Sequence, residues 1–536
     1  MARPARQPSP SRRNRARAST LALLLCVSAS ACAGTIGDIT QGLCERIAPA
    51  PCPESLVIGV AAYVYGYPLL MVDVTKNVAT NVRDATTTTG RAPINQFSHN
   101  GLPDQSYKDV VLPSVSTPYS NAFLDLRAGP IVLHIPPVGD LCQVDGGPPC
   151  VPRFFLMQMI DGWTNVGGAD DACIAAGSTP PPGFCGVGSR YFTTPGDYAL
   201  VGPGWNRPLP AGITQVVRFQ TNIAWIAGRH LTTGTAQDIA QVRAIQQQYA
   251  LIPIARYGKP YTPTTHAPVD PRVDMQTIPR DQVAQMDAAT YFSLLADLMR
   301  DNPPSPDDAE ILAAMSSIGI VPGQPFNIHA LDASTQQALQ AAAVIGQKLI
   351  AEASQRLQLT TTGWSMALDL GTWGTHYLER AGVAYGGLGA NLFKDAVYAG
   401  VLTDQHGDDL VGDADYRLRF EASAYPPVDS RAFWSVTLYQ RPTETLYDNS
   451  NARNALGIPA AQGHLPCAEQ DGALVLYIQH DMPTNTADDP NAVCNWLGLP
   501  APAPGTRFLL LLRLYWPVAP LFDATNPWVP PAVTKQ

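Results

Sequence analysis

The sequence predicts an α+β protein in which two β-rich domains, sandwich or jelly-roll-like, are joined by a helical insert. Short apolar runs bounded by Gly, Pro and Asp occur before residue 230 and again after residue 410, and such runs are typical of antiparallel strands. Between these regions, from about residue 235 to 360, apolar residues recur at the spacing of amphipathic helices. The 50 prolines and 43 glycines favour the many turns that β-rich domains need.

The length of 536 residues favours several domains, since a typical domain has about 100 to 200 residues. With 46% hydrophobic and 15% charged residues, the chain has the composition of a globular protein and not of a disordered or polytopic membrane protein. We divide it into a signal peptide (1–31), an N-terminal tether (32–52), a β-rich domain (53–230), a helical linker domain (231–360) and a β-sandwich domain (361–536).

The first 31 residues are typical of an export signal, because six arginines are followed by an apolar run and then by small residues. Ala29-Ser30-Ala31 is an acceptable cleavage site. The same residues followed by Cys32 resemble a bacterial lipoprotein box in which Ala replaces the preferred Leu, so simple cleavage and lipidation of Cys32 both stay open. We expect an exported protein, either anchored to the cell envelope by this lipid or extracellular, with no other membrane contact.

The charge of the mature chain argues against nucleic acid as a partner. The formal net charge is −9, and removing the six arginines of the first 31 residues leaves 29 basic against 44 acidic residues, or −15. A chain this acidic repels phosphate backbones, and no basic stripe interleaved with aromatic residues offsets the repulsion.

Eight cysteines remain if Cys26 is removed with the signal and Cys32 is lipidated. An even number in an exported protein predicts disulfides, and these cysteines fall into couples that are neighbours in sequence. The predicted pairs are Cys44 with Cys52, Cys142 with Cys150, Cys173 with Cys185, and Cys467 with Cys494. The rival interpretation is a metal site, but C-x-x-C and H-x-x-x-H spacings are lacking, so we expect no metal. We expect no cofactor either.

In the first β-rich domain, residues 54–65 can form a helix, which we expect Pro68 to end. Residues 131–135 and 154–160 are short apolar runs of the kind that strands show, and similar segments continue to about Trp225. They predict an antiparallel sheet region.

The helical region begins after a proline-rich segment, 255–280, that we expect to be an extended linker. Apolar residues between Tyr291 and Leu298 then follow the i, i+3, i+4, i+7 pattern, and a second stripe begins at Leu339. Ser305 followed by Pro306 and two aspartates predicts the start of another helix, because a hydroxyl cap, an initial proline and acidic residues all favour a helix N-terminus.

The sequence predicts a β-sandwich for the last domain. Residues 416–421 alternate strictly between apolar and charged side chains, as expected for a strand with one buried face. The runs 434–439, 473–480 and 508–515 follow, separated by turns. Repeated short strands of this kind indicate a β-sandwich or jelly-roll-like domain.

Several strings in the chain match one family. They are Tyr65-Gly66-Tyr67-Pro68-Leu69, Tyr119-Ser120, Leu124-Asp125-Leu126, Gly129-Pro130, Asp161-Gly162-Trp163-Thr164-Asn165, Gly202-Pro203-Gly204-Trp205, Phe433-Trp434-Ser435-Val436-Thr437-Leu438-Tyr439, Asn495-Trp496-Leu497, and Arg513-Leu514-Tyr515 with Pro517. Over roughly residues 55–230 and 365–530, the chain resembles the bacterial family that couples domain of unknown function 1254 to domain of unknown function 1214. The resemblance implies two β-rich domains with helical insertions, often in exported proteins, and no established activity.

One segment departs from the family's pattern. In Pro113-Ser114-Val115-Ser116-Thr117-Pro118-Tyr119 the resemblance leads us to expect Asn and Asp in place of Ser114 and Ser116. If those polar residues bind a ligand in the family, this chain has changed or lost that ligand.

The best candidate site is Asp161 with Trp163 and Asn165, because these residues follow a strongly apolar strand and should emerge at its end. Asp161 would be the catalytic group, since a carboxylate accepts hydroxyl protons, and an indole stacks on a sugar or an apolar ring. Arg190 and Arg229 would join Trp163 and Asn165 in binding, by holding a ligand carboxylate. The alternative is that Asp161 and Asn165 satisfy a turn while Trp163 fills the core.

His376 and Glu379 are secondary candidates, because one helical turn separates them and they could share a metal or a proton. A surface or capping pair is the commoner outcome for such spacing. In the last domain we assign Trp434 and Trp496 to the core and Arg513 to a structural ion pair.

Two functional classes follow. The first is a hydrolase acting on a glycan or related envelope polymer, with paired carboxylates as acid and base. The second is a non-catalytic binding or interaction module of the cell envelope, which needs only exposed aromatic residues in a groove. A cleft with two close carboxylates and a perturbed pKa would favour the enzyme. The expected ligand is a small molecule or a glycan, and the sequence leaves the oligomeric state open.

Overall fold

The computed structural model describes residues 53–103, 112–141, 150–167, 195–355, 360–368, 370–447, 453–458, 466–487, 489–499, 505–523 and 525–536. The expected signal peptide and tether lie outside the described residues, and so do Cys32, Cys44, Cys52, Cys142, Cys173, Cys185 and Arg190.

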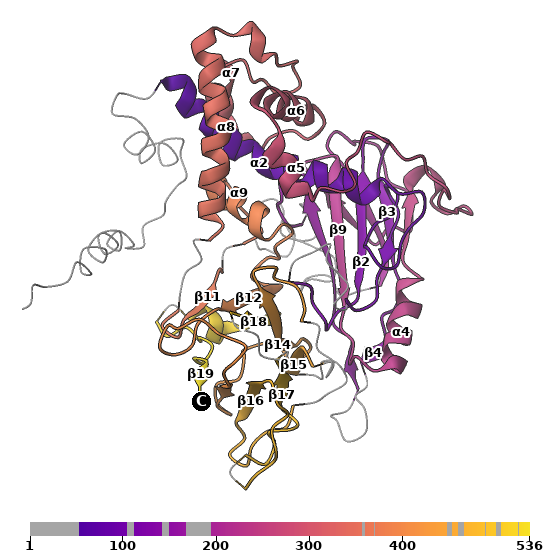
Figure 1. The fold of residues 1–536 in the computed structure, drawn as a ribbon. Coiled ribbons are helices and arrows are strands. Elements are labelled where there is room, and N and C mark those ends of the chain that lie inside the picture. The colour runs from indigo at the N-terminus through magenta and orange to yellow at the C-terminus, as the bar shows by residue number, and fades with distance from the viewer. Residues whose placement is uncertain are drawn as a thin grey trace, which may run out of the picture.

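Within the described residues, the N-terminal domain is a sandwich of two sheets (Figure 1). The first has the order β1-β2-β9-β6, with β1 at Ser98–His99, β2 at Tyr119–Asp125, β9 at Ile223–His230 and β6 at Phe155–Asp161. The second has the order β10-β3-β7-β8, with β10 at Ala250–Pro253, β3 at Ile131–Ile135, β7 at Gly196–Val201 and β8 at Gln215–Arg218. A short ribbon pairs β4 (Asp140–Leu141) with β5 (Val151–Pro152). Apolar side chains of both large sheets, such as Leu124 and Leu133, pack between them.

The C-terminal domain repeats this design with other strands. One sheet has the order β11-β12-β18-β14-β15, with β11 at Trp364–Met366, β12 at Ala396–Val401, β18 at Arg507–Tyr515, β14 at Trp434–Arg441 and β15 at Ala455–Ile458. The other has the order β17-β16-β13-β19, with β17 at Trp496–Gly498, β16 at Leu474–Gln479, β13 at Tyr416–Phe420 and β19 at Thr534–Lys535. The strands expected at 416–421, 434–439, 473–480 and 508–515 are therefore confirmed.

Apart from α4 (Ala236–Gln246), the described helices gather around α2 in one region of the molecule (Figure 1). They are α2 (Glu54–Thr80), α5 (Pro279–Gln285), α6 (Ala288–Asp301), α7 (Ala309–Ser317), α8 (Ala333–Ala353) and α9 (Tyr377–Gly386). Short 3-10 turns lie at η1 (Ile254–Arg256), η2 (Pro306–Asp308), η3 (Ile328–Ala330) and η4 (Ala519–Phe522), and Ser305 caps η2 as expected.

The helical core does not coincide with the stretch 231–360. It also contains α2, which precedes that stretch in sequence, and α9, which follows it. Both helices pack against α8. Conversely, β10 joins the N-terminal sandwich by pairing with β3, and it follows α4 (Ala236–Gln246). The helical region is thus assembled from separate parts of the chain.

The expectation that Pro68 ends the first helix is wrong, because α2 continues through Pro68 to Thr80. Proline in a helix interior costs about 3 kcal/mol, since it removes a hydrogen bond and crowds the preceding turn. Beyond it, Leu69, Leu70 and Met71 are buried in the helical core, and each such side chain contributes about 1.5–3 kcal/mol. Burial therefore outweighs the cost of the proline.

By length and composition, α2 could also cross a membrane. Of its most apolar stretch, however, 89% is buried inside the protein. A buried apolar helix of this kind is what the centre of a large helical core requires.

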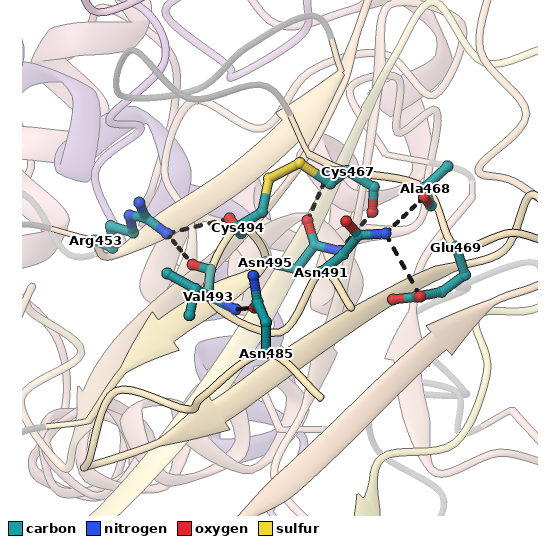
Figure 2. The surroundings of a disulfide bond; sticks show 9 residues. All are labelled: Arg453, Cys467, Ala468, Glu469, Asn485, Asn491, Val493, Cys494 and Asn495. Carbon is teal, nitrogen blue, oxygen red and sulfur yellow. Dashed lines mark hydrogen bonds between the residues drawn. A yellow bond between two sulfur atoms is a disulfide. The ribbon is translucent and has the colours of Figure 1, made fainter. Parts of the chain in front are cut away.

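Cys467 and Cys494 form a disulfide, as predicted (Figure 2). Asn495 holds Cys467 on both sides, since the Cys467 backbone N–H donates to Asn495 Oδ1 at 2.8 Å and Asn495 Nδ2 donates to the Cys467 carbonyl oxygen at 2.7 Å. Arg453 donates to the Cys494 carbonyl oxygen at 3.1 Å. Cys150 is disulfide-bonded as well, and its partner lies outside the described residues.

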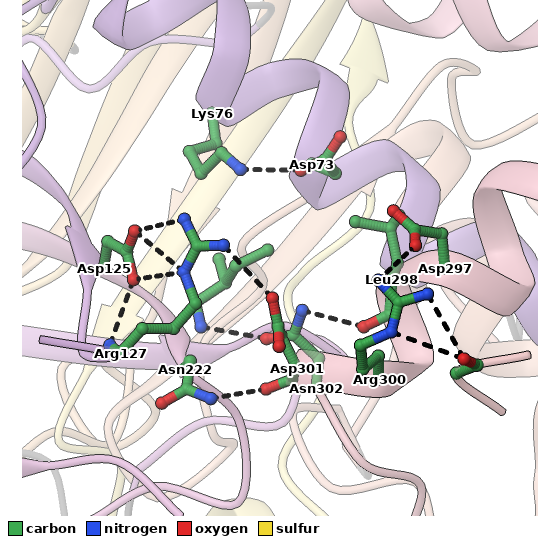
Figure 3. Close-up of polar contacts among 12 residues, drawn as sticks. Asp73, Lys76, Asp125, Arg127, Asn222, Asp297, Leu298, Arg300, Asp301 and Asn302 are labelled. Carbon is green, nitrogen blue, oxygen red and sulfur yellow. Dashed lines mark hydrogen bonds and ion pairs between the residues drawn. The ribbon is translucent and has the colours of Figure 1, made fainter.

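The C-terminal end of α6 is tied to the N-terminal sandwich by polar contacts (Figure 3). Arg127 bridges the two parts, with Nη2 2.6 Å from Asp125 Oδ2 and Nη1 3.1 Å from Asp301 Oδ2. Asn222 Nδ2 donates to the Asp301 carbonyl oxygen at 2.6 Å. The helical region and the sheet that carries β2 and β9 are therefore held together directly.

A buried ion pair fixes α4 against the other edge of this domain. Arg153, which precedes β6, has Nη2 2.6 Å from Asp238 Oδ1, and both side chains are buried. Asp238 also accepts hydrogen bonds from the Thr232 hydroxyl at 2.7 Å and the Thr233 backbone N–H at 2.8 Å. Arg153 Nη1 donates to the Leu231 carbonyl oxygen at 2.7 Å. Both charges of the pair are thus matched inside the protein.

Candidate functional site

A cavity of about 1210 Å³ lies between the two sandwiches. Strands β2 and β9 line it from the N-terminal domain, and β12 and β18 line it from the C-terminal domain. Helix α9, the end of α8 and the segment at Leu112 and Pro113 complete the lining. The volume exceeds the roughly 300–1,000 Å³ of an ordinary small-molecule pocket.

Strand alternation decides which side chains reach this cavity, because successive residues of a strand point to opposite faces of the sheet. In β18, the odd-numbered residues from 509 to 515 line the cavity, while the even-numbered residues from 508 to 514 belong to the sandwich core. In β9, residues 225, 227 and 229 line it, while 224 and 226 face the other core. Each sheet gives one face to its own core and the other to the cavity.

Arg229, predicted to bind a ligand, lies in the wall formed by β9 and is 9% exposed. Its Nη1 donates to Gln158 Oε1 at 2.7 Å and to the Ala227 carbonyl oxygen at 3.1 Å. The guanidinium lies over the Tyr119 ring, 5.4 Å from the ring centroid. Its Nε is buried without a hydrogen-bond partner in the described part of the chain.

Arg513 lies in the facing wall, on β18, and is 3% exposed. Its Nη1 donates to Thr437 Oγ1 at 3.1 Å, and its Nη2 donates to the Tyr439 hydroxyl at 2.8 Å and the Leu112 carbonyl oxygen at 2.7 Å. These partners are neutral, and within the described residues no carboxylate forms the expected ion pair with Arg513. The reason is that alternation places Arg513 on the cavity face of β18. Trp434 and Trp496 are buried, as expected.

Three tyrosines of the cavity wall interact with both arginines. Tyr119, Tyr398 and Tyr515 all line the cavity, and each interacts electrostatically with both guanidinium groups. Tyr119 is the cross-strand neighbour of Arg229, and Tyr398 is that of Arg513. Burial raises the pKa of Tyr515 well above its usual range, so its hydroxyl stays protonated at physiological pH.

Two carboxylates also line the cavity, Glu379 from α9 and Glu444 from the turn after β14. Glu379 Oε2 lies 3.7 Å from His376 Nδ1, and both side chains are about half exposed. Burial raises the pKa of Glu444, although Arg280 and Arg441 act to lower it. Among the residues that the structure describes, no group of three or more His, Cys, Asp or Glu side chains is arranged to hold a metal ion.

The structure does not bring Asp161, Trp163 and Asn165 to this cavity. Asp161 is 4% exposed, and its Oδ1 accepts from the backbone N–H groups of Trp163 at 2.9 Å and Asn165 at 2.8 Å. Its Oδ2 accepts from Asn165 Nδ2 at 3.0 Å. The Trp163 ring packs on Tyr65 in the helical core, 4.9 Å between centroids. These contacts fit the alternative interpretation, in which the carboxylate satisfies a turn and the indole fills the core.

Asp161 is expected to make stability depend on pH. Burial raises its pKa to about 6, although hydrogen bonds from Asn165 and Trp163 act to lower it. Between about pH 4 and 6 the folded state thus keeps a proton that the unfolded chain loses, so stability falls as the pH rises through this window. Relative to Asp161→Asn, the wild type should lose about 3 kcal/mol of unfolding free energy across it, measured by urea unfolding at several pH values.

The variant is needed as a reference because two histidines act in the opposite direction. Burial lowers the pKa of His99 to about 4 and that of His230 to about 3, so both make stability rise with pH as the unfolded chain loses their protons. Both histidines are present in wild type and variant, and their effect cancels in the difference. A difference that stays constant from pH 4 to 7 would contradict the prediction.

Sequence reasoning missed Arg513, Tyr398 and Tyr515 as residues of a site. The available signal was the single charged side chain in the run Phe508 to Tyr515, which alternation places on the face opposite the even-numbered leucines. The even-numbered face of this strand is fully apolar and belongs to the sandwich core. A charged residue on the opposite face indicates that the opposite face does not pack in a sandwich core.

The fold and the cavity define a class of protein in which two β-sandwiches line a cavity between them. Two family models match the chain, a protein of unknown function (DUF1254) at residues 94–253 and a protein of unknown function (DUF1214) at residues 395–519. The chain belongs to the family that pairs these two domains in this order, as the resemblance in its sequence led us to expect.

The fold is shared with a solved structure, the VPA0106 protein from Vibrio parahaemolyticus. That protein is 19% identical, with a TM-score of 0.60 over 90% of this chain and 100% of its own. An uncharacterized protein from Burkholderia cenocepacia is 11% identical, with a TM-score of 0.37 over 94% of this chain and 98% of its own. No curated protein sequence matches this chain significantly.

Proposed function

We propose that this protein binds a small molecule in the cavity between its two domains. The single observation that carries the proposal is the cavity itself, about 1210 Å³ in volume and walled by side chains from both sandwiches. Most ligand sites are concave and largely apolar, with a few polar groups that fix orientation. Leucines of β18 and Trp225 supply the apolar surface here, and Arg229 and Arg513 are among the polar groups.

The arrangement of the walls supports a preformed site. The Tyr439 hydroxyl donates to the Pro113 carbonyl oxygen at 2.5 Å, which joins the C-terminal sheet to the segment before β2. Gln158 Nε2 donates to the carbonyl oxygens of Gly389 and Ala390, both at 2.9 Å. A site whose walls are already fixed loses less entropy when a ligand binds.

We further propose that the protein acts in the cell envelope or outside the cell. The arginine-rich start, apolar run and small residues of the first 31 residues support export, with a lipid on Cys32 as the anchor if that residue is modified. The disulfide between Cys467 and Cys494 supports an oxidising compartment.

Filling the cavity is expected to abolish binding of an apolar probe. Gly400 on β12 lines the cavity, and a Cβ there would meet only Ser365 Oγ at 3.5 Å and Leu511 Cδ1 at 3.8 Å, which is ordinary contact. Gly400→Leu therefore places a side chain in the open space. Phenylnaphthylamine, which fluoresces on transfer to apolar surroundings, should bind the wild type and lose about tenfold or more in affinity to the variant.

The matched control is Ala341→Leu, which adds the same side chain on an exposed face of α8. It should leave the probe affinity unchanged. Equal binding of phenylnaphthylamine to Gly400→Leu and to the wild type would show that the probe does not occupy this cavity, and absence of probe binding to the wild type would overturn the proposal.

A glycan hydrolase is the second candidate, favoured by one observation. Glu379 and Glu444 line the same cavity, and burial raises the pKa of Glu444, as a general acid needs. Release of reducing ends from purified envelope glycans by the wild type, and its loss in Glu444→Gln, would support hydrolysis.

A further inference from the structure

Two buried arginines face the cavity from opposite domains without a matching negative charge. Neither Arg229 nor Arg513 forms an ion pair with a carboxylate of the described residues, and both are at least nine-tenths buried. Removing a guanidinium from water costs several kcal/mol, so buried charges in proteins are normally paired.

A buried arginine elsewhere in the chain has a carboxylate partner. Arg153, which is also buried, is paired with Asp238 at 2.6 Å. At the cavity, by contrast, Arg229 and Arg513 contact only neutral oxygen atoms and tyrosine rings. Within the described residues, the charges of Arg229 and Arg513 therefore have no anionic partner.

Unsatisfied polar atoms lie at the same place. Among the described residues, buried Arg229 Nε has no acceptor. Buried Asn391 Oδ1 has no donor there either, although Nδ2 of the same side chain donates to the Tyr398 hydroxyl. Buried polar atoms without partners are rare in folded proteins, and each usually marks a missing water, ion or ligand.

The two glutamates of the cavity do not fill this role, because their charges have other neighbours. Glu379 lies beside His376 on the half-exposed side of α9, and Glu444 interacts with Arg280 and Arg441.

Much of the remaining wall is apolar. Its apolar side chains include Trp225, Met366, Val401, Leu509 and Leu511. They cannot bind an anion, but they can pack against a hydrocarbon group attached to one. A small hydrated anion would leave most of this surface in contact with water, whereas a molecule with an apolar body would cover it.

We propose that the ligand is an amphiphilic carboxylate or related oxyanion, with its charged head between Arg229 and Arg513 and its apolar body along the leucines of β18. This inference rests on the proposed function, because it names the chemical class that the cavity binds. Arginine suits such a head, since its planar fork of N–H donors matches a carboxylate in two parallel hydrogen bonds.

Two matched pairs of probes test the charge alone. Anilinonaphthalene sulfonate is phenylnaphthylamine with an added sulfonate, and decanoate differs from decanol at its head group. We expect decanoate, below its micelle concentration, to displace phenylnaphthylamine from the wild type with about tenfold or greater advantage over decanol, because a charge-assisted hydrogen bond in a buried site is strong. Anilinonaphthalene sulfonate should bind tighter than phenylnaphthylamine for the same reason.

The variants Arg513→Gln and Arg229→Gln should each remove most of the advantage of decanoate while keeping the binding of phenylnaphthylamine. Arg272→Gln is the control, since Arg272 is exposed and pairs with Asp270 next to it. If either glutamine variant fails to fold, Arg513→Lys and Arg229→Lys keep the charge but lose the fork, and a partial loss is expected.

The outcomes separate the two proposals. Equal displacement by decanoate and decanol in the wild type, which needs no variant, would overturn the anionic ligand while leaving a small-molecule cavity in place. An unchanged preference for decanoate in both arginine variants would overturn it as well. No binding of any probe to the wild type, or binding that Gly400→Leu does not affect, would overturn the proposed function and this inference together.

Discussion

Replacing Arg153 by methionine is expected to lower the free energy of unfolding by about 4 kcal/mol. The side chain is buried, and its removal leaves the Asp238 carboxylate in the protein interior without a cation. Thr232 and Thr233 still donate hydrogen bonds to Asp238, but they do not neutralise it. Urea or thermal unfolding of the purified variant at pH 7 measures the loss.

A double-mutant cycle distinguishes loss of the pair from loss of packing. Arg153→Met with Asp238→Asn removes both charges, so the double variant should be more stable than the sum of the two single losses predicts. Additive losses would contradict an interaction between these side chains. Lowering the pH should also reduce the penalty of Arg153→Met, because Asp238 then binds a proton.

Replacing Gly346 by leucine is expected to cost about 4 kcal/mol, at the upper end of the effects of overpacking. At Gly346, α8 packs closely on α2, since a Cβ there would lie 2.5 Å from Tyr63 Cδ1 and 2.9 Å from Tyr63 Cγ. The Tyr63 ring cannot move aside easily, because it is fully buried and stacked on Tyr291 at 4.0 Å between centroids. Either the ring or one of the two helices must shift.

The control again lies on the same helix. Ala341→Leu adds the same side chain to the exposed face of α8 and should change stability by less than about 0.5 kcal/mol. Chemical unfolding of the two variants side by side gives the comparison. If Gly346→Leu is as stable as Ala341→Leu, α2 and α8 are packed less tightly at Gly346 than the structure shows.

The strands were predictable where burial is one-sided and local. The segment Tyr416 to Phe420 alternates in sequence, and in the structure its apolar side chains are buried while Arg417 and Arg419 are half-buried or exposed. Such a pattern is readable because the period of a strand fixes which residues share a face. No knowledge of distant parts of the chain is needed.

The length of α2 was not predictable in this way. Pro68 breaks the local rule for helices, and only the packing of Leu69, Leu70 and Met71 in a core built largely from residues after 279 compensates for it. That compensation is tertiary, so the local pattern at Pro68 predicts the wrong end for the helix.

The candidate site was predictable only in part for the same reason. Arg229 was selected for its donor fork, and it does line the cavity, although its role in binding stays a prediction. Asp161 was selected because it ends an apolar strand, yet β6 ends toward the helical core and not toward the cavity. Arg229 and Arg513 line the same cavity only because the two sandwiches pack side by side. No local sequence pattern predicts how the two sandwiches pack.

The packing of α2 against α8 has a consequence for the order of events during synthesis. α2 leaves the ribosome first among the described elements, but its main partner is complete only at Ala353. At 5 to 20 residues per second, the chain from Thr80 to Ala333 takes roughly 10 to 50 s to make. Throughout that time α2 lacks its main native partner, and contacts between such distant segments also form slowly. The helical core therefore cannot form completely until α8 has been synthesised, long after α2 has left the ribosome.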